Sequence, residues 1–349
     1  MAYKSIHRLK LLFLALFITS VTASIAAGQW RLQKIATQAS FRGLSVVNNK
    51  VIWASGTNGT VVRTVDGGKT WQIIIVPGAE KLDFRDVEAF DANLAYILSI
   101  GPGESSRIYQ TTDGGQTWAL QFQNTDQNAF FDALAFWDKE QGLAMSDPVS
   151  GRFLLLSTID GGKHWTPVNS ANIPPAIAGE GGFAASGTCL ITRGKRDALL
   201  VSGGAVARVY HSGDKGQTWN VQETQLQKGT AGAGIFSIAF TTAKKGIIVG
   251  GDYTKPDISE NTAAFTEDGG NSWTLANKFP NGFRSGVAFS RKHKYAAAVG
   301  TSGTDLTRDG GRTWQTIDAE DFNAVAAAPD GSFWAAGPRG RLGRLQPFN

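Results

Sequence analysis

Residues 64–71 read Thr-Val-Asp-Gly-Gly-Lys-Thr-Trp, and this stretch decides the fold because its pattern, Ser/Thr-x-Asp-x-Gly-x-x-Trp, returns five more times along the chain. The six aspartates lie 47, 47, 54, 54 and 41 residues apart. Repeats of roughly 40 to 50 residues are typical of β-propeller blades. The motif residues are Asp66, Asp113, Asp160, Asp214, Asp268 and Asp309, followed by Trp71, Trp118, Trp165, Trp219, Trp273 and Trp314.

The composition of the motif predicts a turn between two strands. An aspartate accepts hydrogen bonds from turn amides, glycine supplies a backbone angle that other residues resist, and tryptophan packs a large apolar face beside the sheet. A calcium ligand or a catalytic acid is not needed six times, so we assign the six aspartates a structural role. None of the four histidines has metal-ligand spacing, and the sequence predicts no metal and no cofactor.

The number of blades follows from what lies outside the six motifs. Each interval between motifs offers four short strand-like runs, and three more follow Trp314, at Phe322–Ala327, Ser332–Ala336 and Arg341–Leu345. A fourth run, Trp30–Lys34, stands at the other end of the chain. Pairing it with the last three would close the ring and remove an exposed edge. The sequence therefore predicts an all-β, seven-bladed β-propeller whose last blade is completed by the N-terminal strand.

Residues 1–27 have the pattern of a secretory signal peptide. Basic residues (Lys4, Arg8, Lys10) precede an apolar run, Leu11–Val21, and small residues lead to Ala27. The run is shorter than the roughly 20 residues that a membrane-spanning helix needs. We therefore expect a cleaved signal over 1–27, a propeller over 28–349, a periplasmic or secreted location, and no stable membrane span after cleavage.

The net charge limits the possible partners, and the cysteine content limits the possible disulfides. The formal charge of the whole chain is +5, and it falls to +2 without residues 1–27, which hold three basic residues and no acidic one. So small a charge gives no support for a nucleic-acid partner. Cys189 is the only cysteine, so no intramolecular disulfide can form.

Candidate binding residues gather where the inner strands are expected to begin. In a propeller, the loops that enter each innermost strand and those that join its second and third strands emerge on one face. Three inner strands open with Phe-Arg, which places Arg42, Arg85 and Arg284 on one arc of that face. The other arc receives Asp132, Asp147, Glu180, Asp252 and Tyr253. The arrangement predicts either a ligand site, basic on one side and acidic on the other, or charges that pair with one another and close the channel.

The six motifs resemble the bacterial neuraminidase (Asp-box) repeats, and together with the Phe-Arg openings the chain looks more closely like the photosystem II stability/assembly-factor family. This resemblance implies a seven-bladed propeller that binds protein partners during assembly and performs no catalysis. It also implies that the basic patch of that family maps onto Arg42, Arg85 and Arg284. Phe131, Ile235 and Asn323 take the equivalent place in other repeats.

Two functions follow from these residues. The sequence favours an exported, non-catalytic propeller that binds a protein or peptide, in the assembly of envelope or membrane proteins. The alternative is a carbohydrate-active enzyme, a glycoside hydrolase or polysaccharide lyase, that uses two of the acids at the channel mouth. A sialidase is disfavoured because Gly43 and Leu44, not Ile-Pro, follow Arg42.

Overall fold

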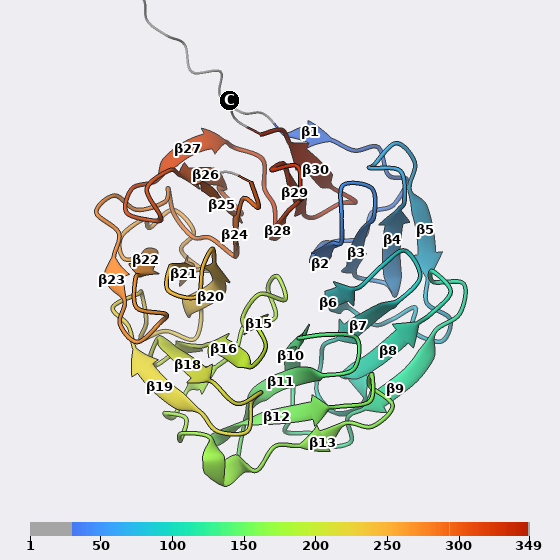
Figure 1. Ribbon diagram of the computed structural model, residues 1–349, viewed down its shortest axis with the longest axis horizontal. Coiled ribbons are helices and arrows are strands. Elements are labelled where there is room, and N and C mark those ends of the chain that lie inside the picture. Colours follow the sequence, from blue (N-terminus) through green and yellow to red (C-terminus); the bar gives the residue numbers. More distant parts are fainter. Residues whose placement is uncertain (1–29, 293, 348–349) are drawn as a thin grey trace, which may run out of the picture.

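Seven antiparallel sheets stand around a central axis in the computed structural model, which describes residues 30–292 and 294–347. Figure 1 looks down the axis and shows the sheets as blades of a ring, as the sequence predicts. The predicted signal peptide and residues 28–29 lie outside the described residues. Within the described ranges, no helix has the length and hydropathy needed to cross a bilayer.

Each blade runs from an inner strand at the axis to an outer strand at the rim. The first three blades contain, in this order, β2 (Phe41–Val46), β3 (Ile52–Gly56), β4 (Thr60–Thr64) and β5 (Gln72–Ile75); β6 (Phe84–Ala89), β7 (Ala95–Ser99), β8 (Arg107–Thr111) and β9 (Ala119–Gln123); and β10 (Phe131–Phe136), β11 (Gly142–Val149), β12 (Arg152–Thr158) and β13 (Thr166–Pro167). Two short 3-10 helices, η1 (Gly103–Ser105) and η2 (Ser170–Asn172), lie in connecting loops.

The remaining blades follow the same order. They contain β15 (Leu190–Arg193), β16 (Asp197–Val201), β18 (Arg208–Ser212) and β19 (Asn220–Glu223); β20 (Ala233–Phe240), β21 (Gly246–Asp252), β22 (Ala263–Thr266) and β23 (Thr274–Leu275); β24 (Gly286–Phe289), β25 (Ala296–Gly300), β26 (Gly303–Thr307) and β27 (Gln315–Asp318); and β28 (Ala324–Ala327), β29 (Phe333–Ala336), β30 (Leu342–Leu345) and β1 (Arg31–Leu32). β14 (Glu180–Gly181) and β17 (Gly203–Gly204) extend the fifth sheet.

The N-terminal strand closes the ring. β1 pairs antiparallel with β30, Arg31 opposite Arg344, so the outermost strand of the last blade comes from the start of the fold. Trp30 anchors it: the ring is 6% exposed, packs on Phe322 with centroids 4.9 Å apart, and donates from Nε1 to Thr304 Oγ1 at 2.8 Å. This closure confirms the prediction made from Trp30–Lys34.

The core lies between blades, because each sheet buries both of its faces against its neighbours. The second strands β3, β7 and β25 are buried along their whole length. One cluster joins the first and last blades through Phe41, Ala54 and Leu342. Runs of apolar or small residues, not strict alternation, therefore suit these second strands.

The repeated motif forms the turn between the third and fourth strands. In the first copy, Asp66 Oδ1 accepts hydrogen bonds from the amides of Lys69 at 2.9 Å and Thr70 at 3.0 Å, and the Thr64 hydroxyl donates to the same oxygen at 2.8 Å. All six aspartates accept a bond from the amide four residues ahead. These bonds occupy the carboxylates within their own turns.

Candidate functional site

Four inner strands begin with the same irregularity. In β2, β6, β10 and β20 the register against the second strand shifts by one residue, and the residues within these shifts are Arg42, Arg85, Asp132 and Phe236. Such a bulge re-aims one side chain out of the regular ladder. All four side chains line one pocket of about 420 Å³ at the centre of the ring.

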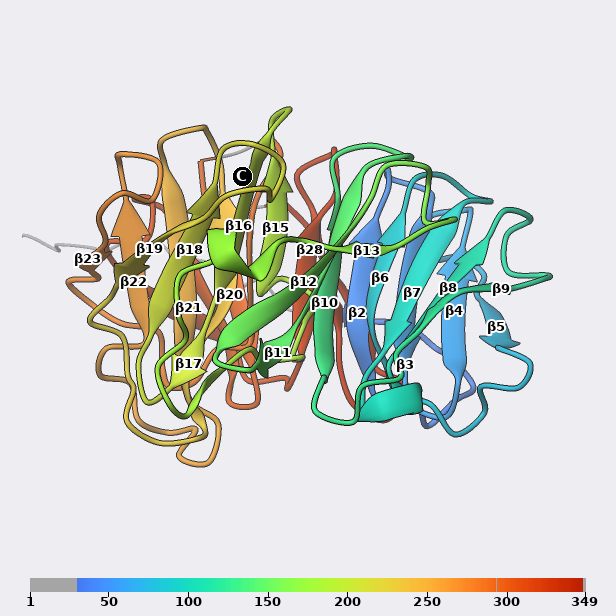
Figure 2. The ribbon, with the colours of Figure 1, turned by 90° about the horizontal axis from the view of Figure 1, so that it is seen from below.

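Every blade contributes to the wall of this central pocket. It opens on the face where the inner strands begin, which is the lower face in Figure 2, where β17 lies; the repeated motifs lie at the opposite ends of the strands. Besides the four bulge residues, the wall is formed by Phe130, Asp147, Gly182, Phe183, Ala184, Ala185, Ala231, Tyr253, Phe283, Ser285, Thr301 and Asn323.

Residues 182–188, the central segment, cross the channel from the fourth blade. The carbonyl oxygens of Ala185 and Ala184 accept hydrogen bonds from Arg42 Nη1 at 3.3 Å and Arg85 Nη1 at 3.2 Å. The Ser186 hydroxyl donates to the carbonyl of Ser285 at 2.8 Å. The segment therefore ties the fourth blade to the first, second and sixth, and it forms one wall of the pocket.

The two arginines form the basic side of the pocket and are partly engaged by the chain itself. Arg85 Nε donates to Asp83 at 2.8 Å in addition to its bond with the central segment. Burial, followed by the charge of Arg85, lowers the pKa of Arg42 to about 10. Arg42 remains cationic at neutral pH, and both guanidinium groups retain donors beyond those that the central segment uses.

Asp132 and Asp147 form the acidic side. Asp132 is 1% exposed, and its Oδ2 is buried without a hydrogen-bond partner. Asp147 Oδ1 accepts a bond from the amide of Gly182 at 2.7 Å. Burial raises the pKa of Asp132 well above its usual range, and the charge of Asp147 adds to the rise. Burial also raises the pKa of Asp147.

Arg284 does not join Arg42 and Arg85. Its side chain is fully buried, and its Nε donates to Asp305 at 2.7 Å within an ion pair. The cause is register: Gly56 stands against the carbonyl of Ser40, whereas the corresponding Gly300 stands against that of Phe283. Arg284 thus takes the position of Phe41. A shift of one residue reverses the face of a strand side chain, so the sixth blade places Ser285 in the pocket instead.

The same register corrects the positions that the sequence comparison assigned to two further residues. Sequence comparison of the repeats placed Phe131 and Ile235 at the position of Arg42. In the structure these residues pair across from Ser146 and Gly250, as Phe41 does from Gly56, and Asp132 and Phe236 occupy the bulge. Asn323 does line the pocket.

Glu180 and Asp252 are bonded outside the pocket. Glu180 forms an ion pair with Arg208 and accepts a hydrogen bond from Ser202 Oγ at 2.6 Å. Asp252 Oδ1 accepts bonds from the amide and hydroxyl of Thr254, at 2.9 and 2.6 Å. Burial alone would raise the pKa of Asp252, but these bonds lower it. Both acids hold loops in place.

Aromatic side chains complete the pocket, and sequence reasoning missed most of them. Phe183 and Phe236 stack with centroids 3.8 Å apart, and Phe283 packs edge-on against Phe236 at 4.7 Å. Tyr253, which the sequence did single out, is 54% exposed at the rim. The glycine-rich stretch around Phe183 was the available signal for an inserted segment.

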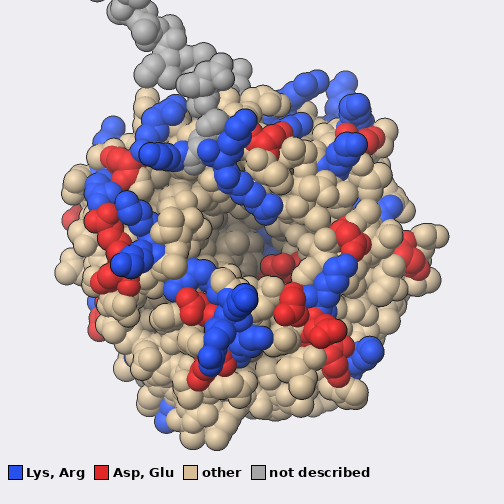
Figure 3. All heavy atoms as spheres, in the orientation of Figure 1, with Lys and Arg blue, Asp and Glu red and all other residues tan. Residues whose placement is uncertain are grey.

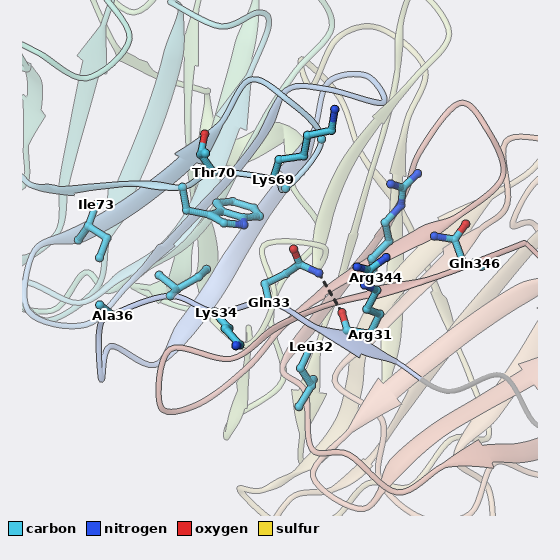
Figure 4. A pocket seen from close by; sticks show the side chains of 14 residues that line it. Arg31, Leu32, Gln33, Lys34, Ala36, Lys69, Thr70, Ile73, Arg344 and Gln346 are labelled. Carbon is cyan, nitrogen blue, oxygen red and sulfur yellow. Dashed lines mark hydrogen bonds between the residues drawn. The ribbon is translucent and has the colours of Figure 1, made fainter.

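A second hollow, of about 840 Å³, lies where β1 closes the ring against the first blade. Figure 4 shows its basic side chains, Arg31, Lys34, Lys69 and Arg344, and the bond from Gln33 to the carbonyl of Arg31. Arg344 pairs with Asp330 at 2.6 Å, and Arg31, Lys34 and Lys69 are exposed to solvent. We favour the central pocket because exposed lysines confer little specificity.

The face opposite the central pocket carries mixed charge. Figure 3 shows this face, hollowed at the centre, with basic and acidic side chains interspersed around the hollow. One pair there joins Lys139 to Asp91 at 2.9 Å. No single sign of charge dominates the view, so this face does not present a uniform surface to a charged partner.

Comparisons with known proteins agree on the fold. No protein-family profile matches the chain, and no curated protein matches it. Among solved structures, it is similar to YCF48 bound to a D1 peptide (20% identity, TM-score 0.63, 90% of this chain and 96% of that one). It is also similar to YCF48 from Cyanidioschyzon merolae (17% identity, TM-score 0.61, 92% and 99%) and to the WD40 propeller domain of Doa1 (9% identity, TM-score 0.59, 91% and 97%). The chain thus has the fold of a complete β-propeller.

Proposed function

We propose that this protein is an exported, non-catalytic β-propeller that binds a peptide segment of a protein partner in the central pocket. The observation that carries the proposal is the pocket itself, where all seven blades meet and present aromatic, basic and acidic groups together. Large aromatic surfaces with a few placed polar groups are typical of binding sites. A structural neighbour, YCF48, was solved with a D1 peptide.

Export and a role in envelope-protein assembly belong to the same proposal. The support for export is the basic and apolar pattern of residues 1–27, which predicts delivery across a membrane. The support for the assembly role is the likeness of the fold to YCF48. A fusion of residues 1–35 to a reporter enzyme that is active only outside the cytoplasm tests the location. Activity of the reporter supports export, and its absence contradicts it.

A bulky substitution at the mouth tests binding in the pocket. Ala231 lies just before β20, is exposed, and lines the pocket. Ala243 lies in the turn just after β20, on the opposite face, and is also exposed. Ala231→Trp should abolish capture of peptides from an array of extracytoplasmic segments, because the indole fills the mouth, and Ala243→Trp should not. Equal capture by the two variants would contradict the proposal.

One observation favours a carbohydrate-active enzyme as the second candidate. Asp132 and Asp147 share the pocket, and burial raises the pKa of both, as a general acid requires. Hydrolysis or elimination on a glycan panel that Asp147→Asn abolishes would establish the enzyme in place of the binding protein.

A further inference from the structure

We infer that the central pocket recognises a cationic group, the ammonium or guanidinium of a lysine or arginine side chain, through Asp132 and Asp147. The inference rests on the proposed peptide-binding function and specifies the partner: a peptide that presents a basic side chain to the channel. It differs from the expectation of the sequence, in which arginines of this chain hold an acidic partner.

The first argument is an unfilled hydrogen-bonding capacity. The backbone amides of Ala184 and Asp147 favour the ionised form of Asp132, but its buried Oδ2 has no hydrogen bond of ordinary geometry among the described residues. None of the ion pairs between described residues includes Asp132 or Asp147. A buried carboxylate oxygen without a donor is costly. Because both carboxylates belong to the lining of the pocket, a charged N–H donor bound there offsets part of this cost.

The second argument is the position of the carboxylates in the chain. Gly182 packs so closely that a Cβ atom there would stand 2.8 Å from Asp132 Oδ2, and a Cβ at Gly181 would stand 2.8 Å from Asp147 Oδ1. The two glycines thus hold both carboxylates against the backbone of the central segment. The carboxylates are fixed before a ligand arrives, which favours binding because little side-chain freedom is lost.

The third argument is the aromatic wall. The stacked rings of Phe183 and Phe236 and the edge-on rings of Phe283 and Tyr253 stand around the same pocket. Aromatic faces attract ammonium and guanidinium groups, and they cover the apolar stem of a lysine or arginine. Carboxylates beside aromatic rings form a site suited to an amphipathic cation.

The arginines of this chain do not already meet the need of Asp132. Arg85 donates to Asp83 and to Ala184, and Arg42 donates to Ala185. The charge of Arg85, in the neighbouring blade, favours the ionised form of Asp132, but no ion pair joins the two side chains. The remaining donors of Arg42 and Arg85 suit a backbone carbonyl or carboxylate of the same peptide. The pocket is therefore dipolar, with its open capacity on the acidic side.

Binding should depend on pH in a defined direction. Burial and the charge of Asp147 raise the pKa of Asp132, and a bound cation, which favours the ionised carboxylate, should lower it. Affinity should therefore rise with pH and binding should release protons. The groups facing Asp132 are Asp147 on β11, Arg85 on β6, Arg42 on β2, Cys189 before β15 and Tyr253 after β21.

The test uses residues 28–349 and a matched pair of probes, Nα-acetyl-lysine methylamide and Nα-acetyl-norleucine methylamide. Ligand-observed NMR and calorimetry at pH 6 to 9 should give at least about tenfold tighter binding of the lysine probe, because hydrogen bonds to charged groups contribute roughly 1.5–3 kcal/mol. Calorimetry in buffers of different ionisation enthalpy should show proton release. Equal binding of the two probes would overturn the inference.

Two variants locate the site. Asp132→Asn should remove the lysine preference and the proton release. Asp138→Asn, which changes an exposed acid in the turn after β10, should leave both unchanged. Should Asp132→Asn fail to fold, Asp147→Asn takes its place. A lysine preference that survives loss of either pocket carboxylate contradicts the inference.

The outcomes separate this inference from the proposed function. Peptide capture that Ala231→Trp blocks, without any lysine preference, would leave the binding protein and remove the cation site. A lysine preference that depends on Asp132, with peptide capture unaffected by Ala231→Trp, would leave a cation site that serves small amines and not peptides. Spermidine and butylammonium are the probes for that second outcome.

Discussion

Arg284 and Asp305 have side-chain exposures of 0% and 1% and form an ion pair inside the sixth blade. Asp305 also accepts from the amide of Asn281 and the hydroxyl of Thr316, so the pair belongs to a bonded network. Removing one partner from such a pair leaves an uncompensated charge in a medium that solvates it poorly. The role of Arg284 is therefore structural.

Replacing Arg284 should destabilise the fold without changing the pocket. We expect Arg284→Met to lower the free energy of unfolding by about 3–5 kcal/mol, since it strands the Asp305 carboxylate. The double variant Arg284→Met/Asp305→Leu should recover most of the loss. Chemical denaturation of the two variants measures this, and a double variant no more stable than the single one would contradict the explanation.

The three arginines show how far the sequence could specify the site. Their shared Phe-Arg pattern correctly brought Arg42 and Arg85 to one pocket, because local pattern and local structure agree in those two blades. It misplaced Arg284, because strand register depends on how the second strand and its glycine meet the inner strand. That pairing is not visible in a dipeptide. The ion pair between Glu180 and Arg208 could likewise not be predicted, because the two residues lie 28 positions apart in the sequence.

At the scale of elements, the central segment (residues 182–188) links the fourth blade to three blades that are not its neighbours in the ring. Gly187 adopts φ +74°, and a Cβ there would stand 2.2 Å from Asp86 Oδ1. Hydrogen bonds from two arginines and one serine hold the neighbouring residues. Only glycine fits this point of the segment.

An alanine at this glycine should loosen the central segment. Gly187→Ala meets both a strained backbone angle and the Asp86 carboxyl, whereas Gly194→Ala, with φ +59° in the same blade, meets nothing within 4 Å. We expect only the first variant to make buried Cys189 reactive toward a thiol reagent under native conditions. Equal labelling rates for the two variants would show that the segment does not cover the thiol.

The strand order and the blade number were accessible from sequence because each repeat encodes its own sheet and turn. The central segment was not, since it has no strand pattern and its partners lie in other blades. Its signal was limited to a run of glycines, and glycines in loops have many uses. The repeated motifs therefore do not predict elements whose position depends on contacts with residues distant in the sequence.

For the molecule as a whole, two sets of carboxyl groups give stability opposite pH dependences. Hydrogen bonds within the motif turns lower the pKa of Asp113, Asp160 and Asp268 to about 2. Because unfolded carboxyls titrate near pH 4, this contribution is complete above about pH 4 and is lost as pH falls toward 2. Burial raises the pKa of Asp86 to about 7 and of Glu88 to about 8, so their contribution is lost as pH rises from about 4 through those values.

Stability should therefore be greatest near pH 4 to 5 and fall on both sides. The free energy of unfolding of Glu88→Gln should match that of the wild type at pH 4 and exceed it increasingly up to pH 8. The reason is that the variant has no buried carboxyl to ionise at this position. The exposed turn residue Glu140 gives the control, Glu140→Gln, which should follow the wild type. Urea denaturation across pH 3 to 9 tests the profile, and stability of wild type that rises steadily to pH 8 would contradict it.

Removal of the closing strand β1 should lower the stability of the ring by more than the loss of a two-residue strand suggests. A chain that begins at Ala36 lacks β1, the Trp30–Phe322 contact and the Trp30 bond to Thr304. Removing a buried tryptophan alone costs about 3–5 kcal/mol. We expect this chain to melt at a lower temperature than residues 28–349 and to self-associate through the uncovered edge of β30, as measured by calorimetry and light scattering.

The pairing of Arg31–Leu32 with β30 also sets when a copy of this protein is finished. A chain in which β30 has not formed leaves β1 without a partner, so the ring cannot close until both strands are in place. Any product released early keeps an unpaired ribbon at each end of its row of sheets. A truncated copy therefore exposes sheet edges that the closed ring does not.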